Sequence, residues 1–334
     1  MSAGQSERDL VVIGASAGGV EALRHLVAGL PADLPAAVCV VLHIAPESPS
    51  ALPAILARAG PLPCRAATDR DELRRGQILV APPDHHLEIE DGHVRLTVGP
   101  RENGHRPSVD VLFRSAAAVA GDKVVGVVLS GSRDDGSAGL ATIKVAGGVA
   151  VVQDPADALY SSMPRSALAA VDVDVVAPVA LIAESVELLV RGRPVPHARV
   201  GRRQPDEDLG DDPMTTVCPE CGGVLSELAQ AGVRQWECRV GHRYSTESFI
   251  DAQAEGIEAG LWAAVRALHD RQLLLDRIAA RFEAAGEPRS ARSFRDRAAH
   301  AGRQTELLRE TLARAAGTSL RPIGVGGRPG EATG

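Results

Sequence analysis

The chain has 334 residues, with 36 basic and 43 acidic side chains and a formal net charge of −7. This acidic balance argues against a protein that binds nucleic acid through basic charge. Hydrophobic residues make up 45% and aromatic residues only 2%, so the core must be built from Ala, Val, Leu and Ile. No apolar run approaches the roughly 20 residues that cross a bilayer, and the N-terminus MSAGQSERDL lacks the apolar stretch of a secretory signal. We expect a cytoplasmic protein with no membrane insertion and no nucleic-acid partner.

The first 190 or so residues alternate short apolar runs with helix-like stretches. Several runs lack polar alternation, as strands buried on both faces do. We expect strands at residues 10–14, 36–43, 78–81, 123–130, 149–153 and 173–176. We expect helices at 19–28, 107–120, 138–145 and 164–170, and a hairpin of residues 86–90 and 93–98. This order predicts an α/β fold, a doubly wound and mostly parallel sheet in a three-layer αβα arrangement.

The composition changes after residue 190. Residues 193–214 are rich in Pro, Arg, Asp and Gly without periodicity and are predicted to form a linker. A Cys/His segment at 215–245 precedes a helical pattern at 246–316, which Gly286 and Pro288 divide into two helices. Two such helices are expected to pack as an antiparallel hairpin. The Gly-rich remainder, residues 317–334, is expected to be a disordered tail.

A Gly/Ser-rich turn, Gly14-Ala-Ser-Ala-Gly-Gly19, follows the first expected strand. A dinucleotide fingerprint would need glycine at Ser16 and an acidic residue where His43 ends the second strand, so both requirements fail. The turn is then either purely structural or a nucleophile elbow, in which small neighbours let a serine project from a sharp strand-to-helix turn.

Candidate catalytic residues stand at three expected strand ends: Ser16, His43, and Asp134 or Asp135. Taken singly, His43 is equally well explained by packing, and either aspartate by helix capping. The carboxyl ends of parallel strands meet at one edge of a sheet, so the three together indicate a triad. In such a triad serine attacks, histidine carries the proton and the carboxylate fixes the imidazole. The order Ser…His…Asp disfavours the usual lipase/esterase fold, whose order is Ser…Asp…His.

Residues 8 to about 190 resemble the catalytic domain of the chemotaxis protein-glutamate methylesterases (CheB-type). Six ordered motifs carry the resemblance: Ile13-Gly-Ala-Ser-Ala-Gly-Gly19, the strand ending at His43, Ile78-Leu-Val-Ala-Pro-Pro-Asp-His-His86, Arg106-Pro-Ser-Val-Asp-Val-Leu-Phe113, Leu129-Ser-Gly-Ser-Arg-Asp-Asp-Gly136 and Met163-Pro-Arg165. The resemblance implies a catalytic domain at residues 8–192. It implies Ser16 as nucleophile, His43 as general base and Asp135 as orienting acid, with Asp134 a bystander.

The same resemblance implies a substrate and further properties of the site. The expected substrate is a glutamyl methyl ester on a methyl-accepting receptor, with deamidation of glutamines left open and no cofactor for catalysis. Ala17 replaces the family's usual threonine and Ser132 its frequent methionine, and the backbone amides of both are expected to serve the oxyanion. His86 and Arg106 also match family positions, where they would either have a structural role or lie near the rim of the active site. The first expected strand begins near residue 10, so we expect no receiver domain ahead of it and no control by one in cis.

The second strong motif is a Cys/His pattern typical of a zinc ribbon. A C-x₂-C pair and a C-x₃-H pair are separated by 16 residues, and the candidate ligands are Cys218, Cys221, Cys238 and His242. Four ligands leave no open position, so the pattern predicts a structural Zn²⁺ rather than a catalytic one. A metal-free CxxC segment is the simpler alternative.

Two other functions stay open at this point. One is a catalytically idle receptor-binding module, against which the intact set of Ser16, His43 and Asp135 argues. The other is a serine esterase that acts on a small-molecule ester. The helical hairpin is expected to pack or oligomerise, or to engage a helical receptor or a partner methyltransferase. A fragment ending near Val190 holds every proposed catalytic group, so we expect it to fold and hydrolyse simple esters by itself.

Overall fold

The computed structural model describes residues 8–44, 46, 50–196, 198–203 and 216–318. The chain forms two compact units, Met1–Asp251 and Ala252–Gly334. The predicted linker from residue 204 to 214 and the predicted tail from residue 319 onward lie outside the described residues. Within the described ranges, no helix is long and apolar enough to cross a membrane.

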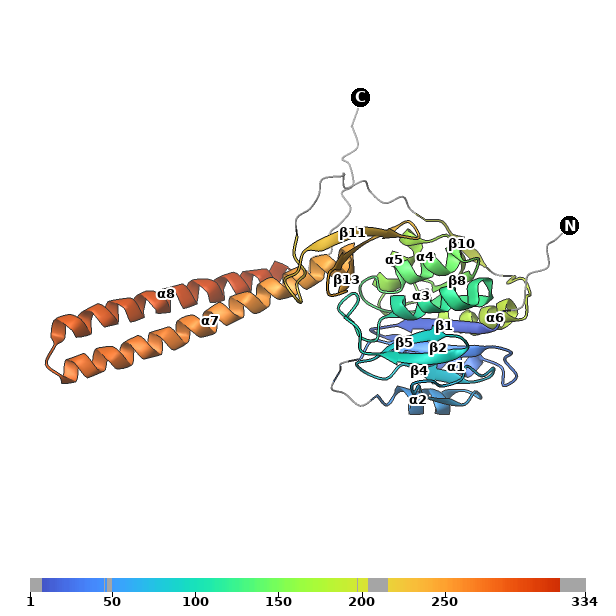
Figure 1. Ribbon diagram of the computed structural model, residues 1–334, viewed down its shortest axis with the longest axis horizontal. Helices are drawn as coiled ribbons and strands as arrows, with labels where there is room; N and C mark the ends of the chain where they lie inside the picture. The colour runs from blue at the N-terminus through green and yellow to red at the C-terminus, as the bar shows by residue number, and fades with distance from the viewer. Residues whose placement is uncertain (1–7, 45, 47–49, 197, 204–215, 319–334) are drawn as a thin grey trace, which may run out of the picture. The chain divides into compact units, whose positions relative to one another are not determined.

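The first unit is built on an eight-stranded sheet (Figure 1). Its strands are β1 Leu10–Ala15, β2 Ala37–Leu42, β3 Cys64–Ala66, β4 Ile78–Val80, β7 Val124–Val128, β8 Val149–Gln153, β9 Val173–Ala177 and β10 Arg199–Gly201. The spatial order is β10-β9-β8-β7-β1-β2-β4-β3, and only β10 pairs antiparallel. The central strands are Val/Ile/Leu runs buried on both faces, as the sequence predicts.

Helices cover both faces of this sheet, as Figure 1 shows. They are α1 Gly19–Gly29, α2 Leu52–Ala59, α3 Val109–Ala120, α4 Ser137–Val145, α5 Ser162–Ala170 and α6 Val179–Val190. One buried cluster joins the sheet to α1, α2 and α6, and another joins the opposite face to α3, α4 and α5. The second face also packs against the predicted hairpin, β5 His86–Glu90 and β6 His93–Thr97. The doubly wound, mostly parallel α/β prediction is confirmed.

Several elements were not predicted from the sequence. Helices α2 and α6 and the edge strands β3 and β10 are absent from the expected set, and β10 falls inside the predicted linker. Both edge strands have only three residues and are largely exposed, so they lack the continuous apolar run that identifies a buried strand.

A small antiparallel sheet follows and belongs to the first unit. Its strands are β11 Leu225–Gln230, β12 Val233–Cys238 and β13 Arg243–Ser245, which we call the ribbon together with the Cys/His segment before them. Its buried apolar side chains are few: Leu225, Trp236 and Tyr244, with Phe249 of the following helix lying about 6 Å from both rings. The ribbon therefore has little hydrophobic core of its own.

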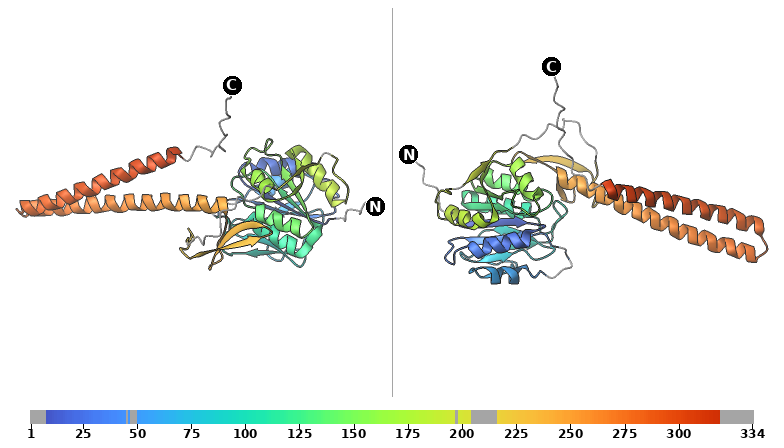
Figure 2. Two further views of the ribbon diagram at one scale, coloured as in Figure 1. Left: turned by 90° about the horizontal axis from the view of Figure 1, so that it is seen from above. Right: turned by 180° about the vertical axis from the view of Figure 1, so that it is seen from behind.

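The C-terminal helices are α7 Thr246–Ala284 and α8 Pro288–Thr318, and Figure 2 shows them as a pair joined at one end by a short turn. The turn contains Gly286 at φ 76°, a left-handed conformation that favours glycine. Phe282 and Phe294 stack across the turn with ring centroids 5.4 Å apart. The predicted helical pair is confirmed, and its break falls at the predicted Gly-Glu-Pro sequence.

Candidate active site

Ser16 lies in a sharp turn between strand β1 and helix α1. The Ser16 amide donates to the Ser130 carbonyl at 3.0 Å, and the Gly19 amide donates to the Ser16 carbonyl at 2.9 Å. Gly18 has φ 70°, and a Cβ there would lie 2.8 Å from the Ser130 hydroxyl, so both its backbone and its surroundings require glycine. The turn holds a half-buried Ser16 at the carboxyl edge of the sheet.

The structure brings Ser16, His43 and Asp135 together at that edge. They follow β1, β2 and β7, and β1 pairs with both of the other strands. His43 Nδ1 lies 3.1 Å from Ser16 Oγ, and His43 Nε2 lies 2.7 Å from Asp135 Oδ2. The His43 side chain is 5% exposed and that of Asp135 is fully buried. This is the connectivity of a serine–histidine–carboxylate triad.

Asp134, the other candidate acid, has a different partner. Its carboxylate accepts a hydrogen bond from the Ser248 hydroxyl at 2.7 Å, in the first turn of α7. Burial raises the pKa of Asp134, although hydrogen bonds from serine side chains oppose the shift. The two neighbouring aspartates thus contact different parts of the chain, and Asp135 is the one that meets His43.

Asp135 lies at the N-terminus of helix α3, where backbone amides and side chains converge on it. Besides His43, its donors are the amides of Val109 (2.7 Å) and Asp110 (3.2 Å), the Ser108 hydroxyl (2.9 Å) and the Asn103 side chain (2.9 Å). Burial by itself would raise the pKa of Asp135, but the hydrogen bond and charge of His43 and the Val109 amide hold it well below the usual range. The α3 dipole acts in the same direction. The carboxylate is therefore kept ionised and immobile.

Two side chains that support this arrangement were missed in the sequence. Asn103 is 1% exposed, and its amide nitrogen donates to Asp135 and to Asp110, both at 2.9 Å. His105 stacks on His43 with ring centroids 3.7 Å apart and an interplanar angle of 15°. Burial, with a contribution from His43, lowers the pKa of His105 to about 3, so this ring is neutral. Both residues lie just before the Arg106–Phe113 motif, and no local pattern identifies them.

His86 and Arg106 shape the loop that leads into α3. His86 Nε2 lies 2.9 Å from the Pro100 carbonyl, and its Nδ1 accepts a hydrogen bond from the Ser108 amide at 3.2 Å. Arg106 donates to the Asp84 carboxylate at 2.6 and 3.0 Å and to a loop carbonyl. Of the two roles left open for these residues, the contacts favour the structural one.

The predicted oxyanion residues lie on two segments that meet beside Ser16. Next to Ala17, the Ser130 hydroxyl donates to the Ala17 carbonyl at 2.9 Å and so ties the elbow to the β7 loop. A Cβ at Gly131, the neighbour of Ser132, would lie 3.0 Å from the Cβ of Ser16. The loop before Ser132 therefore passes in close contact with Ser16, while donation to an oxyanion by either amide stays a prediction.

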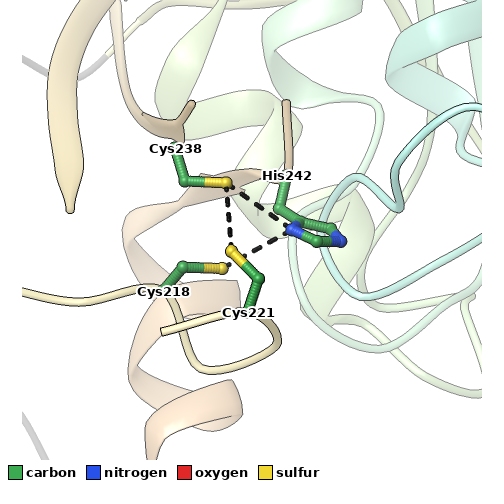
Figure 3. Close-up of side chains that lie close together, drawn as sticks. All are labelled: Cys218, Cys221, Cys238 and His242. Atoms are coloured by element: carbon green, nitrogen blue, oxygen red, sulfur yellow. Dashed lines mark hydrogen bonds between the residues drawn. The ribbon is translucent and has the colours of Figure 1, made fainter. Parts of the chain in front are cut away.

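The four predicted metal ligands converge in the ribbon, as Figure 3 shows. Their ligand atoms all lie within 4.8 Å of one another, and the residues are Cys218, Cys221, Cys238 and His242. The distances are 3.7 Å from Cys218 Sγ to His242 Nδ1, 3.6 Å between the sulfurs of Cys221 and Cys238, and 3.5 Å from Cys238 Sγ to His242 Nδ1. A tetrahedral zinc site places its ligand atoms about 3.5–3.8 Å apart, so the group fits one.

Neighbouring groups orient these ligands and favour their metal-binding forms. The Glu220 carboxylate lies 3.1 Å from His242 Nε2, which leaves Nδ1 directed at the cysteines. Burial opposes a thiolate at Cys238, but backbone hydrogen bonds from His242 and Val240 lower its pKa to about 6. By contrast, burial raises the pKa of Cys39 to about 12, as expected of a thiol that only packs.

Comparison with known proteins identifies relatives of the sheet unit. Residues 11–186 match the family model of the CheB methylesterases. Protein-glutamate methylesterase/protein-glutamine glutaminase 2 of Anaeromyxobacter dehalogenans is 42% identical over 183 residues, 55% of this chain and 54% of that protein. A Leptospira interrogans protein described by the same two activities is 41% identical over 177 residues, 53% of this chain and 92% of that protein. The crystal structure of the Thermotoga maritima CheB methylesterase catalytic domain superposes with a TM-score of 0.53 at 31% identity and covers 55% of this chain and all of that one.

Proposed function

Because this chain belongs to the family of CheB methylesterases, enzymes that act on methylated chemoreceptors in chemotaxis adaptation, we propose that Ser16, His43 and Asp135 are its catalytic triad. The single observation that carries the proposal is the continuous contact from Ser16 Oγ through the His43 ring to Asp135, 3.1 and 2.7 Å long. The substrate proposed for this chain is a glutamyl methyl ester of a cytoplasmic receptor segment. The same site would hydrolyse a glutamine amide.

In the first half of the reaction, Ser16 Oγ attacks the γ-carbonyl carbon of the ester. Neutral His43 accepts the hydroxyl proton at Nδ1, while its Nε2–H donates to Asp135. The negative charge that develops on the carbonyl oxygen is assigned to the backbone amides of Ala17 and Ser132. The imidazolium then returns its proton to the departing methoxide, so methanol leaves and a glutamyl-serine ester remains.

The second half of the reaction regenerates the enzyme. A water molecule gives a proton to His43 and attacks the acyl carbon, and that proton then returns to Ser16 Oγ as the new carboxylic acid departs and releases its remaining proton to the solvent. The buried and multiply hydrogen-bonded Asp135 stays ionised throughout and stabilises the imidazolium in both halves. With glutamine in place of the methyl ester, ammonia is the leaving group and the steps are otherwise the same.

The role proposed for the Cys/His group is structural. Four ligand atoms would complete the coordination of a Zn²⁺ and leave no position for a substrate. The ribbon has few buried apolar side chains, so metal binding would supply much of its folding energy. No step of the proposed reaction passes through this group.

A surface feature favours a protein substrate over a small ester. Leu159 and Tyr160 are 75% and 48% exposed, and they border the nucleophile elbow, since a Cβ at Gly18 would lie 3.1 Å from atoms of both. Exposed apolar side chains beside a nucleophile suit the apolar face of a receptor helix. Binding of a receptor or a methyltransferase by the helical hairpin stays a prediction.

The test is release of methanol from a methylated chemoreceptor fragment by the purified chain, compared with turnover of a small acyl ester. We expect a kcat/KM at least tenfold higher on the receptor, and loss of both activities in Ser16→Ala. Turnover of the small ester without methanol release from any methylated receptor would support the alternative of a small-molecule esterase.

A further inference from the structure

The ribbon forms hydrogen bonds with the loop that holds the triad, and both lie in the first unit. The amide of Asn103 donates to the Arg243 carbonyl of β13 at 2.7 Å, and the Ser245 amide donates back to Asn103 Oδ1 at 2.9 Å. Glu102 and Arg243 form a parallel bridge. Strand β13 therefore fixes both the backbone and the side chain of Asn103.

The same loop, residues 101–105, carries both side chains that support the triad. Its ends are joined by reciprocal backbone hydrogen bonds between Glu102 and His105, of 3.2 and 2.9 Å. Asn103 directs its amide nitrogen at Asp135, and His105 stacks on the ring of His43. Any shift of this loop would therefore displace groups that contact two of the three triad members.

Both hydrogens and the oxygen of the Asn103 side-chain amide have hydrogen-bond partners, and these partners determine its orientation. The oxygen accepts from Ser245 of the ribbon, while the nitrogen donates one hydrogen to Asp135 and the other to Asp110. Rotation of the side-chain amide would place its oxygen against the Asp135 carboxylate and its nitrogen against the Ser245 N–H. The ribbon thereby selects the orientation that satisfies the catalytic carboxylate.

The first two turns of α7 also contact the loop that carries Asp135. Ser248 donates to Asp134, the neighbour of Asp135, and Arg133 pairs with Asp251 at 3.1 Å. These contacts, like those of Asn103, come from residues directly after the Cys/His group. The C-terminal part of the first unit thus encloses the acid loop.

The metal ligands lie directly before the residues of β13 that contact Asn103. His242 immediately precedes Arg243, and the Cys238 amide donates to the His242 carbonyl at 3.0 Å, where the chain turns from β12 into β13. A metal that joins Cys238 and His242 to the two cysteines before β11 would hold this turn closed. Without it, the small core of the ribbon offers little to keep β13 in place.

We propose that Asn103 is a positioning residue of the triad and that the metal-held ribbon clamps it, so that loss of the metal slows the chemical step. The inference rests on the proposed triad and metal site. The clamp acts on orientation rather than on substrate binding, because neither Asn103 nor β13 touches Ser16 Oγ in the contacts described. A misplacement of a catalytic group by about 1 Å can cost about 100-fold in rate.

The first test compares two glycine substitutions in the full-length, zinc-loaded chain, with p-nitrophenyl acetate as substrate. Asn103 and Asp91 both have positive φ, 53° and 45°, so glycine preserves either backbone. Asn103→Gly is expected to lower kcat about 10- to 100-fold with KM changed less than about threefold. Asp91→Gly, in the exposed β5–β6 turn, is expected to keep the wild-type kcat. A wild-type kcat in Asn103→Gly, or an effect on KM alone, would overturn the assignment.

The second test asks whether the metal acts through Asn103. Cys221 is exposed, so Cys221→Ser removes a ligand without opening the core of the sheet. We expect this variant to lose zinc and to show a fall in kcat similar to that of Asn103→Gly. In the double variant the loss should exceed that of Asn103→Gly by less than about threefold, because the two changes break one chain of contacts. Losses that multiply would contradict the clamp.

Zinc removal and replacement in the wild type tests the same effect without a substitution that could cause misfolding. A chelator is expected to lower kcat and added zinc to restore it, with metal content and hydrogen exchange at residues 101–105 changing in parallel. Ser16→Ala, measured beside these samples, distinguishes failure of the triad from failure of the clamp. Activity retained in Ser16→Ala would refute the triad. If Ser16→Ala is inactive but the kcat of the otherwise wild-type chain changes neither with zinc nor with substitution of Asn103, only the clamp is refuted.

Discussion

The catalytic edge of the sheet and the Cys/His group both bring functional side chains together, but they do so in different ways. His43 is 27 residues from Ser16 and 92 from Asp135, and three neighbouring strands buried on both faces bring them together. The metal ligands span only 24 residues, and β11 beside them is mostly exposed. The first site is held by a large apolar core, whereas the second has few buried apolar side chains beside it and, in the role proposed for it, would depend on the ion that it binds.

The two regions meet at residues 101–105, where β13 contacts the loop that supports the triad. If the proposed clamp holds, both the apolar core of the sheet and the metal site of the ribbon contribute to the rate of catalysis. The two regions can be distinguished by experiment, because substitution of the triad should act on the sheet edge and metal removal on the ribbon.

The largest effect is expected at the sheet edge. Ser16→Ala, His43→Ala and Asp135→Asn should each lower kcat by about 10⁴-fold or more without unfolding the chain, since triad members act as a unit. Asp134→Asn is the matched control, because it changes the adjacent carboxylate that binds Ser248 instead of His43. Its loss should stay below about tenfold. Equal losses in Asp134→Asn and Asp135→Asn would show that the acid is wrongly assigned.

Metal removal should destabilise the ribbon and leave the stability of the sheet unchanged. With a chelator, backbone amides of β11 and β12 are expected to lose their hydrogen-exchange protection, while those of β1 and β7 keep theirs. The reason is that the ribbon buries few apolar side chains, whereas these strands are fully buried. Addition of zinc should restore the protection of the ribbon and of the 101–105 loop that β13 contacts, and should leave that of β1 and β7 unchanged. Loss of protection throughout the sheet would mean that the two regions form one cooperative unit.

On the acid side, the pH dependence should reflect one proton at the sheet edge, because burial and the charge of Asp135 raise the pKa of the nearby Asp110 to about 8 and this carboxyl changes charge only on the alkaline side. Although burial opposes it, the contact with His43 holds the pKa of Asp135 well below its usual range, and burial lowers the pKa of His105 to about 3. Neither group then changes charge between about pH 5 and 8, and His43 must be neutral to accept the Ser16 proton. On the acid side, kcat/KM should fall about tenfold for each pH unit. A fall of about 100-fold per unit would show that a second group titrates.

The smallest effect is expected at the exposed rim of the elbow. Leu159→Ser should raise KM for a methylated receptor fragment about three- to tenfold by removing apolar contact area, and should leave p-nitrophenyl acetate turnover unchanged. Val145→Ser is a matched control, because Val145 is 76% exposed at the end of α4 and borders none of the triad residues in the described contacts. Equal effects of Leu159→Ser on both substrates would place this residue in the chemistry rather than in recognition.

The sheet and the triad could be predicted because their signals are local. Ser16, His43 and the Asp134–Asp135 pair each follow an apolar run, and parallel topology brings the ends of such strands together. The choice of Asp135 over Asp134 came from the family resemblance. The cysteine spacing likewise predicts which four side chains lie close together. Asn103 could not be found in this way, since its contacts with Asp135 and Ser245 span 32 and 142 residues and no sequence period encodes them.

The proposed clamp lowers the activity expected of a fragment ending near Val190. Such a fragment holds the triad and the apolar core, but it lacks Ser245, Arg243 and Ser248, whose partners lie in the loops around Asp135. The clamp implies that the fragment folds and works with a lowered kcat. The domain boundaries predicted from composition did not reveal this contact, because hydrogen bonds across a linker leave no trace in composition.

Covalent capture of the nucleophile tests most directly whether His43 and Asp135 activate Ser16. A fluorophosphonate forms a stable ester with a serine whose proton is removed by a neighbouring base. Peptide mass spectrometry of the full-length chain should locate one adduct, on Ser16, and the adduct should disappear in His43→Ala. An adduct on a different residue, or labelling of Ser16 that is as fast in His43→Ala as in the wild type, would contradict the account.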